Sequence, residues 1–279
     1  MIRIERIFSF DSPELSPYIT MRRPADHEGR GIFVAEGEKV VRRLLESHFG
    51  VVSVVFSEKY LEGFRSLIEA RPEMIAVYLA EKELLEKLTG FAMFQGVLAV
   101  GKIPEAATFE KVLQTTSTPR LFAAVDGVAN SENLGALVRN CVAFGVHALF
   151  VGESSSSPFL RRAVRNSMGT VFQLPVVELG KGITYGQTLA QTVLALRQHG
   201  VRCIAAHPRE AKSLTRSDFT GDCCLVFGSE GPGISSAVLE SCDEAVAIPM
   251  RENVDSLNVG AAAAVFLYEA QRQREKTLR

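Results

Sequence analysis

Several features that would assign this 279-residue chain to a special class are missing. Its first ten residues, MIRIERIFSF, mix charged and apolar side chains, so we expect no secretory signal. The longest apolar run, residues 260–268, is far shorter than the ~20 residues that cross a bilayer. Hydrophobic residues make up 47% and charged residues 23%, which is typical of folded soluble proteins. We therefore expect a cytoplasmic protein with no membrane partner.

The chain also has few cysteines and a small net charge. The five cysteines are odd in number and contain no Cys-x-x-Cys pair, so neither a disulfide framework nor a zinc site is expected. Cys223 and Cys224 lie in an apolar run and are expected to be core residues. The net charge of −1 counts mildly against a nucleic-acid partner, although binding depends on local patches and not on the sum.

The periodicity of apolar residues predicts two α/β units. The first contains predicted helices at 38–47, 61–70 and 81–88 and strands at 51–56, 75–78 and 96–100. The second contains strands at 121–125, 148–151, 203–206, 223–227 and 245–248, and helices at 134–144, 188–198, 235–241 and 259–274. Alternation of strands and helices favours a mostly parallel sheet covered on both faces. We assign a first domain to 1–106, a linker with a short helix near 109–113 to 107–118, and a second domain to 119–279.

Ligands of such sheets bind in loops beyond the carboxyl ends of the strands. In the loop after residue 125, Asn130 and Ser131 are good helix N-caps. Arg139 follows within an otherwise apolar helical stretch, where it calls for an anion. That anion is either a carboxylate of the protein or a phosphate of a partner, and the residues alone leave both open.

Two further strand-end loops are unusual. The segment 228–233 holds three glycines and a proline and forms either a plain turn or a cradle for a nucleotide-like ligand. It is not a Walker loop, because no Gly-Lys-Ser/Thr follows, and its glycine spacing differs from Gly-x-Gly-x-x-Gly. After residue 248, a polar segment leads into the final helix. Its Ser256 and Asn258 are candidate caps whose side chains can also bind a ligand.

The loop after residue 151 is followed by clustered arginines. Arg161, Arg162 and Arg165 lie a turn apart or less on a predicted helix, where they either position phosphate or form a solvated face.

Taken together and in this order, the loops resemble the three motifs of the SpoU (TrmH-like) family of RNA ribose methyltransferases, in the SPOUT superfamily. Asn133-x-Gly135-x-x-x-Arg139 resembles the first motif. Gly228-Ser-Glu230-Gly-x-Gly233 resembles the second, and Ile248-Pro249 with Ser256-Leu257-Asn258 the third. Residues 33–37 and Gln95-Gly96 resemble the L30e-like substrate-binding domain that many members carry.

The resemblance implies a knotted (trefoil) α/β methyltransferase domain, a smaller N-terminal L30e-like domain and a homodimer without metal. It implies transfer of a methyl group from S-adenosylmethionine to a ribose 2′-hydroxyl in RNA, with ribosomal RNA favoured over transfer RNA. The implied catalytic residues are Arg139, Asn133, Glu230, Ser256 and Asn258. The implied cofactor-binding residues are Gly228, Ser229, Gly231, Ile248, Met250 and Leu257. The expected RNA-binding residues are Arg161, Arg162, Arg165, Glu36 and Gln95.

The family's central arginine corresponds to Arg139. A guanidinium stays protonated at neutral pH, so we favour a role in binding phosphate and stabilising the developing alkoxide over a role as general base. Two alternatives stay open: a catalytically silent RNA-binding protein that uses its first domain, and a nucleotide-dependent enzyme on a generic doubly wound fold. The second lacks any phosphate fingerprint in the expected loops.

Overall fold

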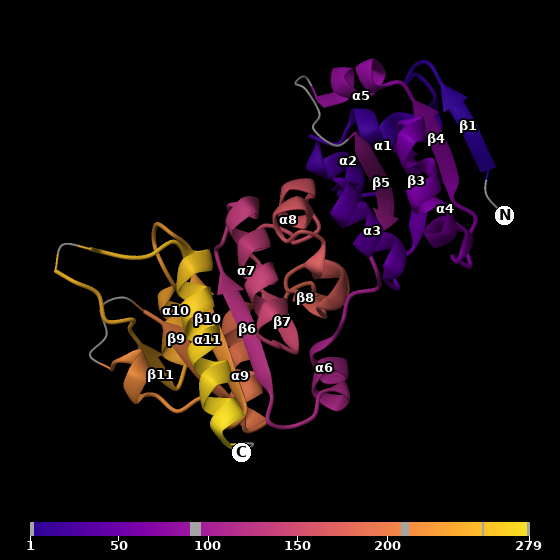
Figure 1. The fold of residues 1–279 in the computed structure, drawn as a ribbon. Coiled ribbons are helices and arrows are strands. Elements are labelled where there is room, and N and C mark those ends of the chain that lie inside the picture. The colour runs from indigo at the N-terminus through magenta and orange to yellow at the C-terminus, as the bar shows by residue number, and fades with distance from the viewer. Residues whose placement is uncertain (1–2, 90–95, 208–211, 253, 278–279) are drawn as a thin grey trace. The chain divides into compact units, whose positions relative to one another are not determined.

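The computed structural model describes residues 3–89, 96–207, 212–252 and 254–277. The chain forms two compact units, each with its own sheet (Figure 1). The first unit comprises Met1–Glu105 together with Phe159–Phe172, and the second comprises Ala106–Pro158 and Gln173–Arg279. The division near residue 105 lies close to the expected domain boundary, but the sequence analysis placed 159–172 in the second domain.

The first unit is built on a five-stranded sheet with the order β1-β4-β3-β5-β2. Strands β1, β4 and β3 are parallel, whereas β5 runs antiparallel to β3 and β2. The strands are β1 (Arg3–Ile7), β2 (Ile32–Glu36), β3 (Val51–Phe56), β4 (Ala76–Ala80) and β5 (Val97–Lys102). The helices are α1 (Ser16–Ile19), α2 (Pro24–Glu28), α3 (Glu38–Glu46), α4 (Leu61–Glu69) and α5 (Lys82–Thr89). The strands and helices predicted between 38 and 100 are confirmed within about two residues.

Segment 159–172 joins the first unit through aromatic packing. Its helix α8 (Arg161–Asn166) packs against β2. The ring of Phe172 lies 5.5 Å from that of Phe33 and 5.2 Å from that of Phe49, centroid to centroid, and the ring of Phe159 lies 6.1 Å from Phe33. These contacts are worth about 0.5–1.5 kcal/mol per pair beyond area burial, which explains why the segment belongs to this unit.

The second unit is a six-stranded sheet in which every neighbouring pair is parallel, in the order β11-β9-β10-β6-β7-β8. The strands are β6 (Leu121–Asp126), β7 (Ala148–Val151), β8 (Val176–Glu178), β9 (Arg202–Ala206), β10 (Cys223–Gly228) and β11 (Glu244–Val246). The helices are α6 (Phe109–Thr115), α7 (Ser131–Ala143), α9 (Leu189–Gln198), α10 (Ser236–Ser241) and α11 (Val259–Thr277). Across both units, the short 3-10 turns are η1 (Pro13–Leu15), η2 (Glu58–Tyr60), η3 (Thr170–Gln173), η4 (Gly182–Thr184) and η5 (Leu214–Arg216).

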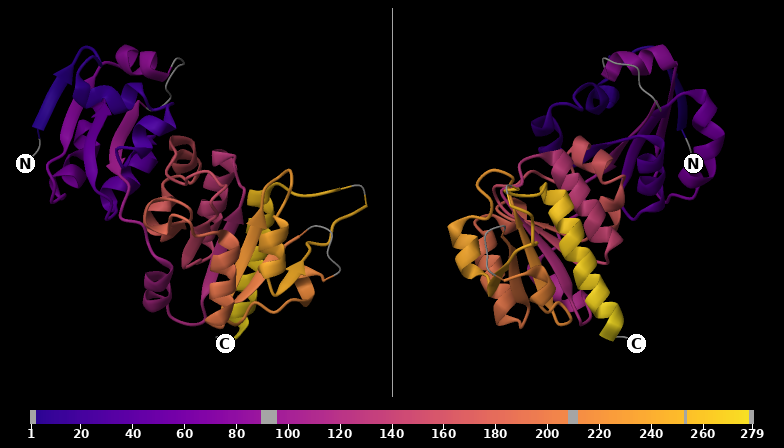
Figure 2. Two further views of the ribbon diagram at one scale, coloured as in Figure 1. Left: turned by 180° about the vertical axis from the view of Figure 1, so that it is seen from behind. Right: turned by 60° about the vertical axis from the view of Figure 1, so that its left-hand side comes forward.

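Helices cover both faces of the parallel sheet, as the sequence predicts. Figure 2 shows α7 and α11 on one face and α9 and α10 on the other. The predicted short helix is present as α6, but it is more than a linker element. Val112 of α6 is buried in the core of the second unit, and the ring of Phe109 lies 5.6 Å from that of His199.

Cys223 and Cys224 are buried in β10, which confirms their expected core role, and the five cysteines are free thiols. None of the helices in the described part of the chain has the length and apolarity to cross a membrane. Because all six strands of the second sheet are parallel, their carboxyl ends meet at one edge, where the candidate site lies.

Candidate active site

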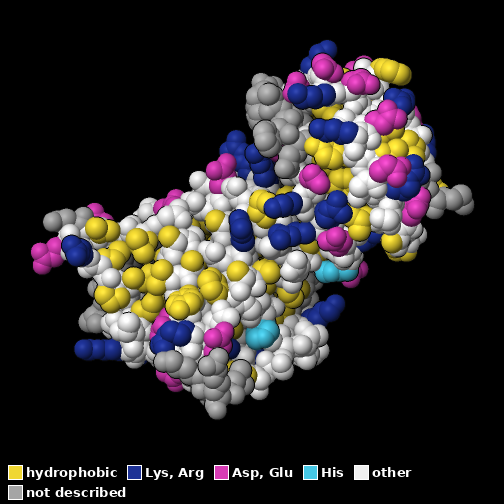
Figure 3. Space-filling view, viewed as in Figure 1, with side chains coloured by type: hydrophobic (Ala, Val, Ile, Leu, Met, Phe, Trp, Pro, Cys, Tyr) yellow, Lys and Arg dark blue, Asp and Glu magenta, His cyan; other side chains and the backbone are white. Residues whose placement is uncertain are grey.

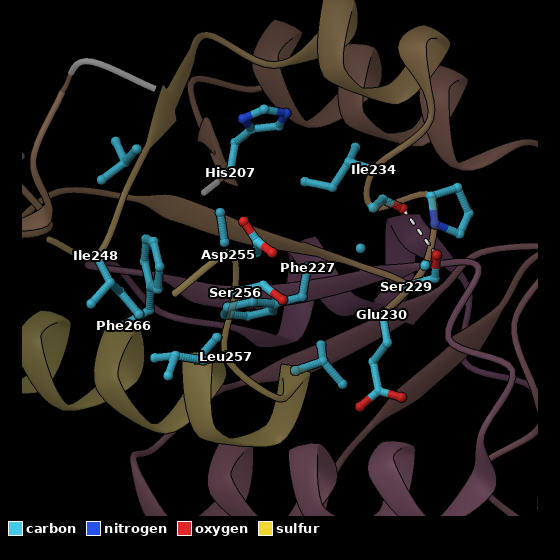
Figure 4. A pocket seen from close by; sticks show the side chains of 18 of the residues that line it. His207, Phe227, Ser229, Glu230, Ile234, Ile248, Asp255, Ser256, Leu257 and Phe266 are labelled. Atoms are coloured by element: carbon cyan, nitrogen blue, oxygen red, sulfur yellow. Dashed lines mark hydrogen bonds between the residues drawn. The ribbon is translucent and has the colours of Figure 1, made fainter. Parts of the chain in front are cut away.

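A cavity of about 520 Å³ opens at the carboxyl ends of β9, β10 and β11 (Figure 4). It is lined by Ala206, His207, Phe227, Gly228, Ser229, Glu230, Gly231, Pro232, Gly233, Ile234, Val246, Ile248, Met250, Asp255, Ser256, Leu257, Val259, Ala262 and Phe266. All six residues expected to bind the cofactor are among them. The walls combine backbone of two loops with apolar side chains, which is the usual character of a small-molecule site.

The glycine-rich loop after β10 is folded back on itself. A Cβ on Gly228 would lie 2.3 Å from the carbonyl carbon of Gly233, so only glycine fits. The Ser229 amide donates to the Gly233 carbonyl at 3.1 Å, and Gly233 itself has a φ of 76°. At the end of the loop, the buried carboxylate of Asp126 accepts a hydrogen bond from the Ser235 amide at 2.7 Å. The loop is therefore closed, tied to β6, and presents its backbone to the cavity.

Asn258 joins all three motif loops. Its side-chain amide donates to Glu230 Oε1 at 2.7 Å and to Asn133 Oδ1 at 3.1 Å. Its own Oδ1 accepts from the amides of Gly260 and Ala261 at 3.0 and 3.3 Å, which caps α11. Three of the five expected catalytic residues thus meet in one hydrogen-bonded group beside the cavity.

The other two expected catalytic residues lie apart from this group. Ser256 lines the cavity and is exposed. Arg139 is exposed on α7 and does not line the cavity of its own chain. Within the described residues its guanidinium has no hydrogen bond or ion pair. Helix α7, which Asn130 caps through the Glu132 and Asn133 amides, is held against α11 by a 2.7 Å bond from Asn140 to the Gly260 carbonyl.

Comparisons with known proteins bear on this arrangement. The model of the SpoU rRNA Methylase family matches residues 120–268, the span that contains the three motif loops and the cavity. The chain belongs to the SpoU rRNA methylase family.

Relatives match between 72% and 97% of this chain. An uncharacterized tRNA/rRNA methyltransferase of Mycobacterium tuberculosis is 33% identical over 94% of this chain and 90% of its own length. The 23S rRNA (guanosine-2′-O-)-methyltransferase RlmB of Escherichia coli is 30% identical over 72% of this chain and 80% of its own length. A solved RNA 2′-O ribose methyltransferase superposes with a TM-score of 0.79 at 25% identity, covering 97% of this chain and all of that one.

A further solved structure supports the fold of this chain and nothing beyond the fold. The SpoU methyltransferase AviRb of Streptomyces viridochromogenes in complex with AdoMet has a TM-score of 0.80 at 24% identity, over 95% of this chain and 100% of its own. The knot and the likeness of the first unit to L30e stay predictions.

The described residues among those expected to bind RNA lie in the first unit and have different environments. Glu36 is buried at the end of β2, where it accepts hydrogen bonds from Arg161 and, at 2.9 Å, from Arg165. The side chain of Arg161 is 14% exposed and that of Arg165 53% exposed. Glu36 and Arg161 therefore neutralise each other as an ion pair, whereas Arg162 and part of Arg165 face solvent. Gln95 lies outside the described residues.

Some residues that line the cavity were not predicted from the sequence. His207 follows β9, and Asp255 and Phe266 come from the third-motif loop and α11 (Figure 4). The strand-end argument, applied also to the run 203–206, would have pointed to His207. In the described part of the chain no cluster of His, Cys, Asp and Glu side chains could hold a metal ion.

Proposed function

We propose that this protein transfers the methyl group of S-adenosylmethionine to a ribose 2′-hydroxyl of RNA, with ribosomal RNA as the substrate class. The observation that carries the proposal is the hydrogen-bonded group of Asn133, Glu230 and Asn258 beside a backbone-lined cavity. Membership of the SpoU family and the 30% identity to a 23S rRNA ribose methyltransferase support the same reaction.

The cavity suits a nucleoside cofactor. Its volume falls within the ~300–1,000 Å³ of small-molecule sites, and apolar side chains such as Ile248 and Leu257 can pack on an adenine ring. The folded-back loop leaves no room for a Cβ on Gly228, so its backbone can approach a ligand closely. We assign cofactor binding to Gly228, Ser229, Gly231, Ile248, Met250 and Leu257. When bound, the cofactor supplies an electrophilic methyl group on a sulfonium.

The chain's own residues must align the target hydroxyl, whose proton has to be removed during the transfer. Alignment alone contributes up to ~7–11 kcal/mol in good intramolecular cases. Arg139 is exposed and has no internal counter-ion among the described residues, so its guanidinium is free to bind a phosphate next to the target ribose. There it stabilises the developing alkoxide, while the proton leaves through that phosphate or water. Asn258 holds Glu230 and Asn133 in fixed positions toward the ribose.

We propose that the protein acts as a homodimer. Apolar side chains gather over α11 and the segment before it (Figure 3). Val254, Leu257, Val265 and Tyr268 are between 39% and 58% exposed there. A second copy that covers this face also explains why Arg139 does not line its own cavity, since the partner's Arg139 can then complete the site. RNA binding outside the cavity is assigned to the solvent-facing Arg162 and Arg165 of the first unit.

The test is transfer of tritium from labelled S-adenosylmethionine to unmodified transcripts of 23S, 16S and transfer RNA. Wild type should label ribosomal RNA, and Arg139→Ala should lose the label while still binding S-adenosylhomocysteine. Arg216→Ala, which removes another exposed arginine of the second unit, is the matched control. Absence of label from every RNA, with the cofactor and RNA both bound, would favour the catalytically silent binder.

The role of Arg139 has its own test in a pH–rate profile of Arg139→Lys. A lower rate with an unshifted profile supports phosphate and alkoxide binding. A new titration in the neutral range would instead show that the side chain at this position acts as the base.

A further inference from the structure

The loop between β8 and α9, residues 179–188, exposes two large apolar side chains that the cavity and the motifs do not explain. The side chain of Ile183 is 66% exposed and that of Tyr185 is 86% exposed. Glycines at 180, 182 and 186 surround them, each with a positive φ between 52° and 81°. A tyrosine ring that is this exposed points to a binding partner for Tyr185.

Hydrogen bonds inside the loop hold these side chains outward. Thr184, between them, is only 3% exposed, and its hydroxyl lies within hydrogen-bond distance of the Glu178 carbonyl and, at 2.7 Å, of the Lys181 carbonyl. The Tyr185 amide donates to the Gly182 carbonyl at 3.2 Å. A Cβ on Gly180 would lie 2.8 Å from Cβ of Glu153, so the loop also packs closely at its base. The ring of Tyr185 is therefore presented by a structured turn.

The position of the loop relates it to the candidate active site. It follows the carboxyl end of β8, and because the sheet is parallel this is the same edge at which the cavity opens. Three strand spacings separate β8 from β10 in the order β10-β6-β7-β8, which is about 14 Å across the sheet. An RNA that places one ribose at the cavity can reach the loop within a few nucleotides.

We infer that Tyr185 stacks on an unpaired base of the substrate RNA a few nucleotides from the methylated ribose. The inference rests on the proposed function and adds an RNA contact on the catalytic unit. Exposed aromatic rings are the usual platform for splayed bases of single-stranded RNA. The Lys181 side chain, 45% exposed at the base of the same turn, is paired with Glu178 at 3.5 Å, so the contact is assigned to the ring and not to charge. Open space around a Cβ on Gly182 and Gly186 leaves the backbone accessible to a phosphate.

The size of the apolar surface favours a base over a protein partner. A stable protein–protein interface uses about 20–30 residues and ~800 Å² on each side. Here only two large apolar side chains protrude from the turn. Stacking of one base needs a single ring, so the small, rigid and isolated ring fits RNA.

The chain contains no tryptophan, which provides a direct assay. Tyr185→Trp introduces the chain's single tryptophan at the proposed contact, excited apart from the tyrosines, and Leu194→Trp places one at an exposed position of α9 as the control. Titration with the unmodified 23S ribosomal RNA transcript should quench the fluorescence of Tyr185→Trp with saturation and leave Leu194→Trp nearly unchanged. Equal responses of the two variants would overturn the inference.

Kinetics give a second readout. A stacked base contributes about 1–3 kcal/mol, so Tyr185→Ala should raise KM for RNA by about fivefold to 150-fold. The kcat and the KM for S-adenosylmethionine should stay near wild type, and Tyr185→Phe should restore KM for RNA because it keeps the ring. Wild-type KM in Tyr185→Ala would refute the contact while leaving the proposed function intact. If wild type labels no RNA, the proposed function fails, and the quenching result then decides the stacking contact separately.

Discussion

The hydrogen-bonded group centred on Asn258 leads to a prediction in which stability and catalysis separate. Asn258→Ala removes the cap of α11, which costs about 1 kcal/mol of the free energy of unfolding. It also removes the bonds to Glu230 and Asn133. Because these side chains are partly or fully exposed, water replaces much of those bonds, and we expect no more than about 1 kcal/mol further. The melting temperature should fall by roughly 2–4 °C per kcal/mol.

Catalysis should suffer more than stability, because a displacement of about 1 Å at such a site can cost a hundredfold in rate. Asn258→Ser separates the two effects. A serine hydroxyl can still cap α11, but it has no amide to span Glu230 and Asn133. We expect its melting temperature to fall less than that of Asn258→Ala, because the cap is kept, and its kcat for tritium transfer to fall about as far as in Asn258→Ala. A serine variant with wild-type kcat would refute the reasoning, since the link between the motif loops would then be dispensable.

Three further outcomes follow from other contacts. Gly228→Ala should abolish binding of S-adenosylhomocysteine in calorimetric titrations, because its Cβ would lie 2.3 Å from backbone atoms of the same loop. The control Gly221→Ala has open space at its Cβ and should bind normally. Glu36→Ala should lower the free energy of unfolding by about 3 kcal/mol in denaturant titrations, since it leaves Arg161, whose side chain is only 14% exposed, without its carboxylate; an unchanged midpoint would contradict this. Burial lowers the pKa of His147, so the folded state favours its neutral form, and this contribution to stability is complete above pH ~6.5 and lost as the pH falls below it. His147→Gln should therefore show a smaller loss of melting temperature between pH 7.5 and 5.5 than wild type, and equal losses would count against the assignment.

The central strands of the second sheet could be predicted from the sequence because both of their faces are buried. All six residues of β6 and five of the six of β10 are buried, and residues 121–125 and 223–227 appear as continuous apolar runs. Strands β1 and β8 give no such signal. The edge strand β1 reads RIERI with four exposed positions, and β8 has only three residues. Edge strands carry charge and stay short for reasons of solubility, which removes the pattern that identifies strands.

The location of segment 159–172 could not be derived from local patterns. Periodicity shows which face of a helix is apolar, but not which sheet that face meets. The rings that receive Phe159 and Phe172 belong to Phe33 and Phe49, more than a hundred residues earlier in the chain. The cavity was more predictable. Three parallel strands contribute their carboxyl ends, and each predicted motif loop follows a strand directly, so the rule for parallel sheets identified most of its lining.

The arginines show where sequence reasoning reaches its limit. The guanidinium groups of Arg139 and Arg161 each need a counter-ion, and the sequence leaves open whether the protein or a partner supplies it. For Arg161 the counter-ion is the buried Glu36, so this charge stabilises the first unit. For Arg139 no described side chain takes that role, and the helix presents the guanidinium to solvent. A cation that the fold leaves uncompensated is available to a phosphate, and for that reason the proposed chemistry depends on Arg139 more than on Arg161.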